Sequence, residues 1–371
     1  MKKIKVLQMP VRNAKGGITQ YALENWVHID KARFIFDWVT LDNYLSFASE
    51  LESQGCRVHY LSGRQEEDEA RFRAEMMAIF SQGYDAIHLH TSYWRGFLAE
   101  ELAIEAGIKK IIVHAHSTGI DVIDAAERAR LLAVHEDWKR RFTPELATDF
   151  VACSGLAADF LYGPQIPKER ILVLKNAIDT EKFAFNENVR NEMRKEMGLD
   201  GKFVILQTAR LVHQKNHAFS LDLFARVVKD VPNAVLLLAG EGTLKESLER
   251  QAAELGITQC VHFLGFRDDV NRLLQAGDVL IAPSLFEGFS ISTIEAQCSG
   301  IRCFCCFCCI PDEAVVLENT RRLPLEMEQW HEEIIGIAKN PPKRRDRSAE
   351  IAAAGYTLNE QINVLKYIYN K

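Results

Sequence analysis

The feature that most constrains this chain is an alternation of strand and helix patterns that runs through almost its whole length. Short runs rich in Val, Ile, Leu and Phe alternate with amphipathic stretches of helical length. Such an alternation indicates parallel strands, because each helix carries the chain back to the edge where the previous strand began. Parallel strands are covered on both faces, which explains why the runs are continuously apolar. The sequence therefore predicts an α/β fold built on doubly wound parallel sheets.

The strand patterns form two series, which indicates two domains. The chain has 371 residues, and single hydrophobic cores stop growing at about 250–300 residues. The first series predicts strands at residues 4–9, 34–40, 57–61, 86–90, 110–114, 150–153 and 171–174, and the second at residues 203–209, 234–239, 261–264, 279–282 and 302–307. We place the seam at residues 176–179, which gives domains of residues 1–176 and 177–354. Two Rossmann-like domains of this kind are expected to face a cleft, with ligands at the carboxyl ends of their strands.

Composition and charge exclude several classes of protein. The net charge is −6, whereas a nucleic-acid-binding protein carries a basic patch or stripe. The apolar part of the first ten residues is too short for a signal peptide and is typical of a strand. No apolar run approaches the roughly 18 residues of a membrane span. We therefore expect a cytoplasmic protein.

Five of the nine cysteines crowd into residues 303–309. The run contains Cys-x-x-Cys spacings, but a structural zinc site usually takes a second pair of ligands, and no such pair lies nearby. Free cysteine behaves as a small apolar residue. We expect the run to be a buried strand, with metal or redox chemistry as the alternative.

The stretch of residues 282–299 combines a strand end, two carboxylates and a helical pattern that starts near Gly288. If a helix separates Glu287 from Glu295, their backbones lie roughly 12 Å apart along its axis. The amides of residues 289–291 would then point out of the helix N-terminus, where anions bind. Carboxylates accept hydrogen bonds from sugar or ribose hydroxyl groups, and free amides bind phosphate. A site that offers both is suited to a nucleotide sugar. The alternative is an ordinary helix with two surface glutamates.

The first domain offers a glycine turn and two histidine pairs. Gly16 and Gly17 follow the first strand, where glycine lets the backbone approach an anion, although a plain turn explains them equally well. The turn lacks the Gly-x-Gly-x-x-Gly pattern, so a nicotinamide site is not supported. The pairs His88/His90 and His114/His116 stand at strand ends, where they can contact substrate. A His-x-His pair can also bind metal or simply pack, and these alternatives stay open.

In the second domain, polar residues follow each strand at the same expected edge of the sheet. Arg210 and Lys215 lie five residues apart after one strand, and two cations in such a loop suit a diphosphate. A solvated basic loop is the alternative. Gly240 and Gly242 form a tight turn after the next strand, and backbone groups of residues 263–270 can reach a base.

Taken together, these residues resemble glycosyltransferase family 4, whose members are retaining enzymes with the two-domain GT-B fold. The likeness covers nearly the whole chain, and within the family it is greatest to bacterial exopolysaccharide and capsule enzymes. It rests on Gly16-Gly17, Asn176-Ala177-Ile178-Asp179, Arg210 with Lys215-Asn216, Gly240-Glu241-Gly242, Phe263-Leu264-Gly265, and Pro283-Ser284 followed by Glu287-Gly288 and Glu295-Ala296.

The resemblance implies roles for these residues. Arg210 and Lys215 would hold the donor diphosphate, Glu295 the ribose, and Glu287 the transferred sugar. His116, which is followed by Ser117, matches the active-site histidine, with His114 in reserve. The remaining donor contacts would come from Gly16, Gly17, Gly240, Gly242, Phe266, Arg267, Gly288, Phe289, Ser290 and Ile291.

The resemblance also implies the partners of the chain. The donor would be a nucleotide diphosphate sugar, expected to be a UDP-sugar, bound by residues 177–354 without a cofactor or metal. The acceptor would be a glycan or a lipid-linked oligosaccharide, held by residues 1–176 at the inner face of the membrane. Residues 355–371 would cross back to the first domain through an apolar stripe of Leu358, Ile362, Leu365 and Tyr369.

The chain departs from the family pattern at three places, and other functions remain as alternatives. Ala177 replaces a glycine, Arg302 replaces a proline, and residues 308–311 replace a loop of small residues near the donor sugar. A nucleotide-sugar epimerase or a phosphorylase would share the fold, and a non-catalytic protein could bind the same ligand. A glycosidase is less consistent, because its two carboxyl groups must flank one glycosidic bond.

Overall fold

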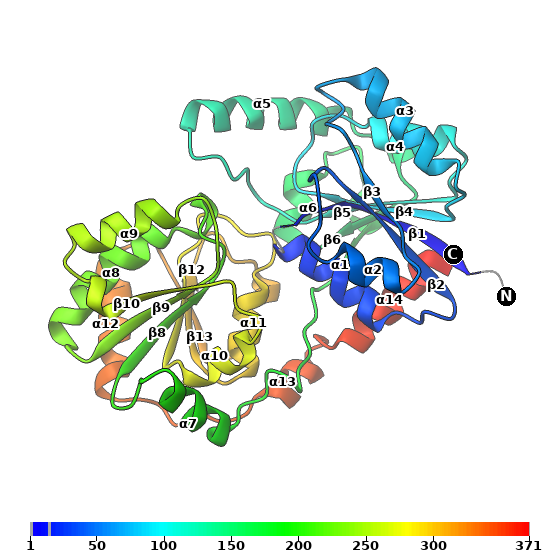
Figure 1. The fold of residues 1–371 in the computed structure, drawn as a ribbon. Coiled ribbons are helices and arrows are strands. Elements are labelled where there is room, and N and C mark those ends of the chain that lie inside the picture. Colours follow the sequence, from blue (N-terminus) through cyan, green and yellow to red (C-terminus); the bar gives the residue numbers. More distant parts are fainter. Residues whose placement is uncertain (1–2, 14–15, 371) are drawn as a thin grey trace. The chain divides into compact units, whose positions relative to one another are not determined.

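A computed structural model describes residues 3–13 and 16–370 of the chain (Figure 1). The structure has two parallel sheets, each in its own compact unit, which confirms the predicted α/β fold with two Rossmann-like sheets. Unit 1 comprises residues 1–120, 124–176 and 358–371, and unit 2 comprises residues 121–123 and 177–357. The chain thus passes to unit 2 after Asn176 and returns to unit 1 at Leu358.

Unit 1 is built on a seven-stranded parallel sheet with the order β3-β2-β1-β4-β5-β6-β7. The strands are β1 (Ile4–Val11), β2 (Phe34–Thr40), β3 (Val58–Tyr60), β4 (Ala86–Thr91), β5 (Lys110–Ala115), β6 (Asp149–Ala152) and β7 (Ile171–Val173). The helices are α1 (Gly17–His28), α2 (Ala48–Ser53), α3 (Glu69–Phe80), α4 (Leu98–Glu105), α5 (Ala125–Arg141), α6 (Gly155–Leu161) and α14 (Leu358–Asn370). Helices α1, α2 and α14 cover one face of the sheet, and α3, α4 and α6 cover the other (Figure 1).

The last helix of the chain, α14, belongs to unit 1. Its residues Ile362, Leu365 and Tyr369 are buried in the same core as Trp26 of α1 and Phe36 of β2. In Figure 1 the red α14 lies beside the blue α1, although the two helices stand at opposite ends of the sequence. The apolar stripe recognised in the sequence is the face with which α14 closes the unit 1 core.

Unit 2 is built on a six-stranded parallel sheet with the order β10-β9-β8-β11-β12-β13. The strands are β8 (Phe203–Thr208), β9 (Ala234–Ala239), β10 (Val261–Gly265), β11 (Val279–Ala282), β12 (Arg302–Cys306) and β13 (Thr320–Leu323). The helices are α7 (Glu187–Glu196), α8 (His217–Asp230), α9 (Lys245–Glu254), α10 (Val270–Ala276), α11 (Ile291–Cys298), α12 (Met327–Lys339) and α13 (Ser348–Ala353). Helices α8, α9 and α12 pack on one face of the sheet, and α7, α10 and α11 lie on the other (Figure 1).

Strand β13 was not predicted, because its sequence does not show the apolar pattern of the other strands. It reads Thr-Arg-Arg-Leu, and it lies at the edge of the sheet, where it pairs with β12. An edge strand needs less apolar surface than a central one, so two arginines are tolerated there.

The cysteine run is partly a buried strand. Cys303, Cys305 and Cys306 are buried in β12, as expected, but the strand ends at Cys306 instead of Phe307. The prediction is wrong for the second half of the run, because Phe307 is 60% exposed and Cys308 and Cys309 lie in a turn. The chain leaves the sheet there and the Ile310 N–H bonds back to the Cys306 carbonyl.

No helix within residues 3–13 and 16–370 is both long enough and apolar enough to span a membrane.

Candidate functional site

Two loops at the carboxyl edge of the unit 2 sheet carry half of the unit 2 residues selected from the sequence, including Arg210, Lys215 and Glu287. The first, the β8 loop (residues 209–216), follows β8, and the second, the β11 loop (residues 283–290), follows β11. Strands β8 and β11 are neighbours in the sheet and run parallel. Their loops therefore emerge side by side, which is why residues about 70 positions apart in the sequence can form one site.

Hydrogen bonds join the two loops directly. The Leu285 N–H donates to the Gln214 carbonyl at 2.8 Å, and the Gln214 side-chain amide donates to the Phe286 carbonyl at 2.9 Å. The Asn216 amide donates to the Pro283 carbonyl at 3.1 Å. Asn216 has φ of 53°, a left-handed conformation that asparagine tolerates better than most residues. The two loops thus form one rigid surface.

Lys215 and Glu287 form an ion pair within this surface. The Lys215 ammonium contacts Glu287 Oε1, and the side chains are only 17% and 6% exposed. Ser284 Oγ donates to the same carboxylate oxygen at 2.7 Å. Because a largely buried charge is costly without its partner, the carboxylate fixes the position of the ammonium group. Sequence reasoning selected both residues, but it did not predict that they bond to each other.

Arg210 lies in the same loop as Lys215 and is exposed. Within the described part of the chain, its guanidinium group has no hydrogen bond or ion pair to another residue. The backbone around it is nevertheless fixed, since the Leu211 N–H donates to the Glu241 carbonyl at 2.8 Å. An arginine whose backbone is fixed and whose guanidinium group is unpaired is suited to bind an anionic ligand.

Gly240 and Gly242 are required by the packing of their turn on the β8 loop. A Cβ atom at Gly240 would lie 2.0 Å from the Ala209 carbonyl oxygen, and one at Gly242 would lie 2.3 Å from the Leu211 carbonyl oxygen. No side chain fits at either position. The two glycines therefore bring the turn against the backbone on either side of Arg210.

Helix α11 begins at Ile291, so the expectation that it starts near Gly288 is wrong. Ser290 precedes the helix with φ of 74°, a left-handed conformation rare for serine, and the chain turns sharply there. The Ser290 hydroxyl bonds to Thr293 Oγ1 at 2.7 Å and does not cap the helix amides. Within the described part of the chain the Ser290 side chain thus leaves the amides at the start of α11 available to an anion.

The later helix start changes the geometry of the two glutamates. Glu287 lies in the β11 loop, while Glu295 lies half-buried in the second turn of α11. The estimate of roughly 12 Å along one helix axis therefore does not apply. The loop conformation is held by Phe289, which is buried and packs 6.1 Å from the Tyr356 ring. Gly288 is buried in the same loop.

Of the two residues selected after β10, the aromatic Phe266 is more available to a ligand than the cationic Arg267. Phe266 is 55% exposed. Arg267 donates two parallel hydrogen bonds of 2.7 Å to the Asp269 carboxylate, and this pairing raises the pKa of Arg267. Its guanidinium group is committed to Asp269, so Phe266 is the residue of this pair that can contact a ligand, by stacking on a base.

In unit 1, the glycine turn is only partly described. Ala14 and Lys15 lie outside the described residues. Gly16 precedes α1 with φ of −75°, and Gly17 is its first residue. A Cβ atom at Gly17 would have no neighbour within 4 Å, so packing does not require glycine there.

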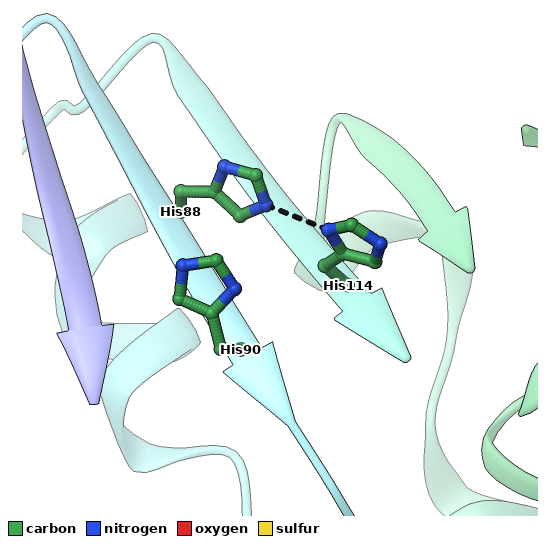
Figure 2. Close-up of side chains that lie close together, drawn as sticks. All are labelled: His88, His90 and His114. Carbon is green, nitrogen blue, oxygen red and sulfur yellow. Dashed lines mark hydrogen bonds between the residues drawn. The ribbon is translucent and has the colours of Figure 1, made fainter. Parts of the chain in front are cut away.

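Four histidines gather at the carboxyl ends of β4 and β5. Figure 2 shows His88 and His90 on β4 facing His114 on the neighbouring β5. All three are buried, and His88 Nε2 lies 3.1 Å from His114 Nδ1. His116 follows β5, is half-buried, and places its Nε2 atom 3.0 Å from His90 Nδ1. The structure thus brings both predicted histidine pairs into one cluster.

Two residues that sequence reasoning did not assign to this site anchor the cluster. Tyr369 Oη lies 2.7 Å from His88 Nδ1, and Gln8 Oε1 lies 2.9 Å from His90 Nε2. With this orientation of the Gln8 amide, His90 donates through Nε2 and accepts through Nδ1. His116 must then carry its proton on Nε2. Gln8 is a polar residue inside an apolar strand and could have been recognised for that reason. Tyr369 comes from the far end of the chain and gave no such indication.

Burial lowers the pKa of every histidine in the cluster. The pKa of His90 falls to about 3, and those of His88, His114 and His116 fall well below the ordinary value. All four imidazoles are therefore neutral at neutral pH, which is also the form that binds metal.

Three of these histidines lie close enough together to be compared with a metal site. One nitrogen each from His88, His90 and His114 lies within 4.8 Å of the others. Nitrogen atoms bound to a tetrahedral zinc ion are about 3.3 Å apart, from zinc–nitrogen distances near 2.0 Å. Existing hydrogen bonds already join the imidazoles in pairs, so the arrangement is that of a hydrogen-bonded cluster.

Comparison with known sequences identifies relatives of the chain. The sequence model described as "Glycosyl transferases group 1" matches residues 189–354. The putative glycosyltransferase EpsF of Bacillus subtilis is 30% identical over 365 residues, which cover 96% of this chain and 94% of that protein. The UDP-Gal:alpha-D-GlcNAc-diphosphoundecaprenol alpha-1,3-galactosyltransferase of Escherichia coli is 27% identical over 228 residues, or 59% of this chain and 57% of that protein.

Solved structures show the same fold at low sequence identity. Anabaena Alr3699/HepE in complex with UDP-glucose superimposes with a TM-score of 0.76 at 18% identity, covering 99% of this chain and all of that one. The sucrose-phosphate synthase of Thermosynechococcus elongatus gives a TM-score of 0.76 at 16% identity, covering all of this chain and 98% of that one. These neighbours support the GT-B fold.

Proposed function

Because the chain belongs to the group 1 glycosyl transferases and is a glycosyltransferase, we propose that it is a retaining family 4 enzyme. It transfers a sugar from a UDP-sugar to a lipid-linked or glycan acceptor in cell-surface polysaccharide synthesis. The observation that carries this proposal is the pair of joined loops in unit 2, in which exposed Arg210 shares a loop with Lys215 and Lys215 pairs with Glu287 of the other loop. Both loops lie within the residues matched by the family model.

The nature of the two substrates is supported by the relatives. The Escherichia coli relative is named for UDP-Gal and a diphosphoundecaprenol acceptor. The Anabaena structure holds UDP-glucose. A lipid-linked acceptor would keep the enzyme at the cytoplasmic face of the membrane as a peripheral protein. The glycosyltransferase names of the relatives favour transfer over an epimerase or a non-catalytic binding protein.

In the proposed donor complex, each unit 2 residue has a separate task. Arg210 holds the diphosphate as a fork, Lys215 holds it as a point charge, and the amides at the start of α11 add hydrogen bonds. Phe266 stacks on the base, and Glu295 accepts hydrogen bonds from the ribose hydroxyls. Glu287 fixes Lys215 in place and faces the bond between sugar and phosphate.

The proposed reaction proceeds on one face of the sugar. The acceptor oxygen forms a bond to the anomeric carbon on the side from which the diphosphate leaves, so the configuration is retained. The acceptor's proton passes to the departing phosphate oxygen. The protein supplies position and positive charge, which stabilise the diphosphate as negative charge develops on it. With Arg210, Lys215 and the helix N-terminus in these roles, we propose that transfer needs no metal, and that His116 contacts the reacting sugar.

The test is calorimetric titration of the full chain with UDP, and with GDP for comparison. Replacing Arg210 by alanine should weaken UDP binding roughly ten- to hundredfold, as expected for hydrogen bonds to a charged group. Arg226→Ala is the matched control, because Arg226 is an exposed arginine on α8 paired with Glu328 away from the loops. Release of UDP from a UDP-sugar should then require an acceptor.

Two results would contradict the proposal. One is a folded wild-type chain that does not bind UDP even at millimolar concentration. The other is an Arg210→Ala variant that binds UDP as the wild type does. Stronger binding of GDP than of UDP would keep the transferase reaction but change the donor.

A further inference from the structure

The turn after β12 brings two cysteine sulfurs together. Cys306, the last residue of β12, and Cys309 have their Sγ atoms 3.3 Å apart. Cys309 Sγ in turn donates to the Leu285 carbonyl oxygen at 2.8 Å. The turn is closed by the Ile310 N–H, which donates to the Cys306 carbonyl at 3.3 Å. Two thiols thus lie in contact beside the β11 loop, which the sequence prediction of a buried strand did not anticipate.

The environment of Cys306 differs from that of the cysteines inside the sheet. In the reduced pair the Cys306 S–H donates to Cys309 Sγ, and the Cys309 S–H donates to the Leu285 carbonyl. When Cys306 ionises, the Cys309 S–H turns to the thiolate, and together with the backbone N–H groups of Cys308 and Cys309 it lowers the pKa of Cys306 to about 7. Burial instead raises the pKa of Cys305 to about 12 and that of Cys303 well above the ordinary value. Since the thiolate is the reactive form, Cys306 is the nucleophilic sulfur of the run.

We propose that Cys306 and Cys309 form a reversible disulfide when the protein meets a peroxide. The Cys306 thiolate attacks one peroxide oxygen, the O–O bond breaks, and hydroxide leaves, so Cys306 becomes a sulfenic acid. Cys309 sulfur then attacks Cys306 Sγ, the S–O bond breaks, and the hydroxide leaves with the Cys309 proton as water. In total, hydrogen peroxide is reduced to two water molecules and two thiols are oxidised to one disulfide. A dithiol reductant reverses the reaction by thiol–disulfide exchange.

The burial of the two sulfurs determines which oxidants can reach them. Cys306 is 2% exposed and Cys309 is half-buried. A molecule as small as hydrogen peroxide can reach them more easily than a bulky disulfide can. Cys308 is exposed at the surface of the same turn, and it serves as the comparison residue because it stands outside the contact pair.

The disulfide would act on the β11 loop. The Leu285 backbone is held at both of its polar groups: its N–H donates to the Gln214 carbonyl, and its carbonyl accepts from the Cys309 thiol. Cys309 has no S–H to donate once it is in a disulfide, and bonding draws the sulfurs from 3.3 Å to about 2.05 Å. Leu285 precedes Glu287 by two residues, and the Glu287 charge reaches Cys309. Oxidation therefore loosens the loop that positions the Lys215–Glu287 pair.

The first experiment asks whether the link forms and where. The reduced full chain is treated with hydrogen peroxide, the remaining thiols are alkylated, and trypsin releases residues 303–321, which hold all five cysteines of the run. The wild-type peptide should lose two hydrogen atoms and link Cys306 to Cys309. Cys308→Ser should behave in the same way. Cys309→Ser should form no link and should instead leave a sulfenic acid on Cys306 that dimedone labels.

Several outcomes would overturn the proposal. The wild-type peptide could keep five alkylatable thiols after peroxide treatment, or the link could involve Cys308. A disulfide that still forms within this peptide in Cys309→Ser would also contradict the proposed link between Cys306 and Cys309. The serine variant retains a hydroxyl that can donate to the Leu285 carbonyl, so its folding should match that of the wild type, and circular dichroism checks this.

The second experiment measures the effect on the loop and rests on the proposed UDP site. UDP affinity should fall about two- to tenfold on oxidation of the wild type, as expected for loss of one hydrogen bond. It should stay constant in peroxide-treated Cys309→Ser. If the link forms but UDP affinity does not change, the disulfide is real and the inferred coupling to the loop is wrong. If the reduced chain binds no UDP at all, the failure lies with the proposed function.

Discussion

Glu100 provides a sharp test of how burial sets the chemistry of unit 1. It lies in the first turn of α4 and is only 4% exposed. Burial, aided by the charge of neighbouring Glu101, raises the pKa of Glu100 from 4.5 to about 8. The folded protein therefore holds a proton on this carboxyl group at neutral pH, where the unfolded chain has lost it. Replacing Glu100 by glutamine removes the titration but keeps the size of the side chain.

The sign and size of the effect follow from linkage. Between pH 4.5 and 8 the folded state binds more protons than the unfolded state, so the stability due to this group is complete below that window and is lost as pH rises through it. Each unit of pKa difference corresponds to about 1.4 kcal/mol. Relative to Glu100→Gln, the wild type should lose about 2.5 kcal/mol of its free energy of unfolding between pH 5 and pH 7.

The assay is urea denaturation at both pH values, followed by tryptophan fluorescence. Four of the five tryptophans, Trp26, Trp38, Trp94 and Trp138, belong to unit 1, so the emission reports mainly on the unit that contains Glu100. Glu101→Gln is the matched control, because Glu101 is the next residue and is exposed. Its pH dependence should stay close to that of the wild type and be slightly smaller, because burial is the main cause of the Glu100 shift and the Glu101 charge only adds to it.

The reasoning fails if wild type and Glu100→Gln lose stability in parallel between pH 5 and pH 7. That result would mean that the carboxylate reaches water in the folded protein and titrates near its ordinary pKa. A shift of the same size in Glu101→Gln would show that the effect comes from net charge and not from burial.

Two further predictions concern the loops and the histidine cluster. Glu287→Gln should lower turnover by very roughly two orders of magnitude, because Lys215 loses the partner that fixes it, whereas Glu295→Gln should mainly raise the donor KM. Steady-state kinetics on variants shown to be folded decides this, and reversed profiles would exchange the two roles. His90 has a folded pKa of about 3, so its share of stability is lost as pH falls below the unfolded value near 6.5. Between pH 7 and pH 5.5 the free energy of unfolding of the wild type should therefore fall by about 1.2 kcal/mol more than that of His90→Gln. Urea denaturation at the two pH values measures this difference.

The sequence by itself determined the fold class and the edge of the sheet where the unit 2 site residues stand. Runs such as residues 234–239 are apolar at every position, and such a run is typical of a strand that is covered on both faces, because all of its side chains are then buried. Once parallel strands are inferred, each loop that follows a strand must lie at the same edge. That is why Arg210, Lys215 and Glu287 could be selected before any coordinates were known.

Only the tertiary structure decided which of these residues bond to one another. Ser290 takes a left-handed conformation next to buried Phe289, and α11 begins only at Ile291; no local pattern in the sequence shows this. Tyr369 reaches His88 across 281 positions of sequence. Cys309 leaves the strand pattern and meets the Leu285 carbonyl. Periodicity reports how a segment divides between core and solvent, whereas side-chain contacts between distant segments depend on how the helices and strands pack.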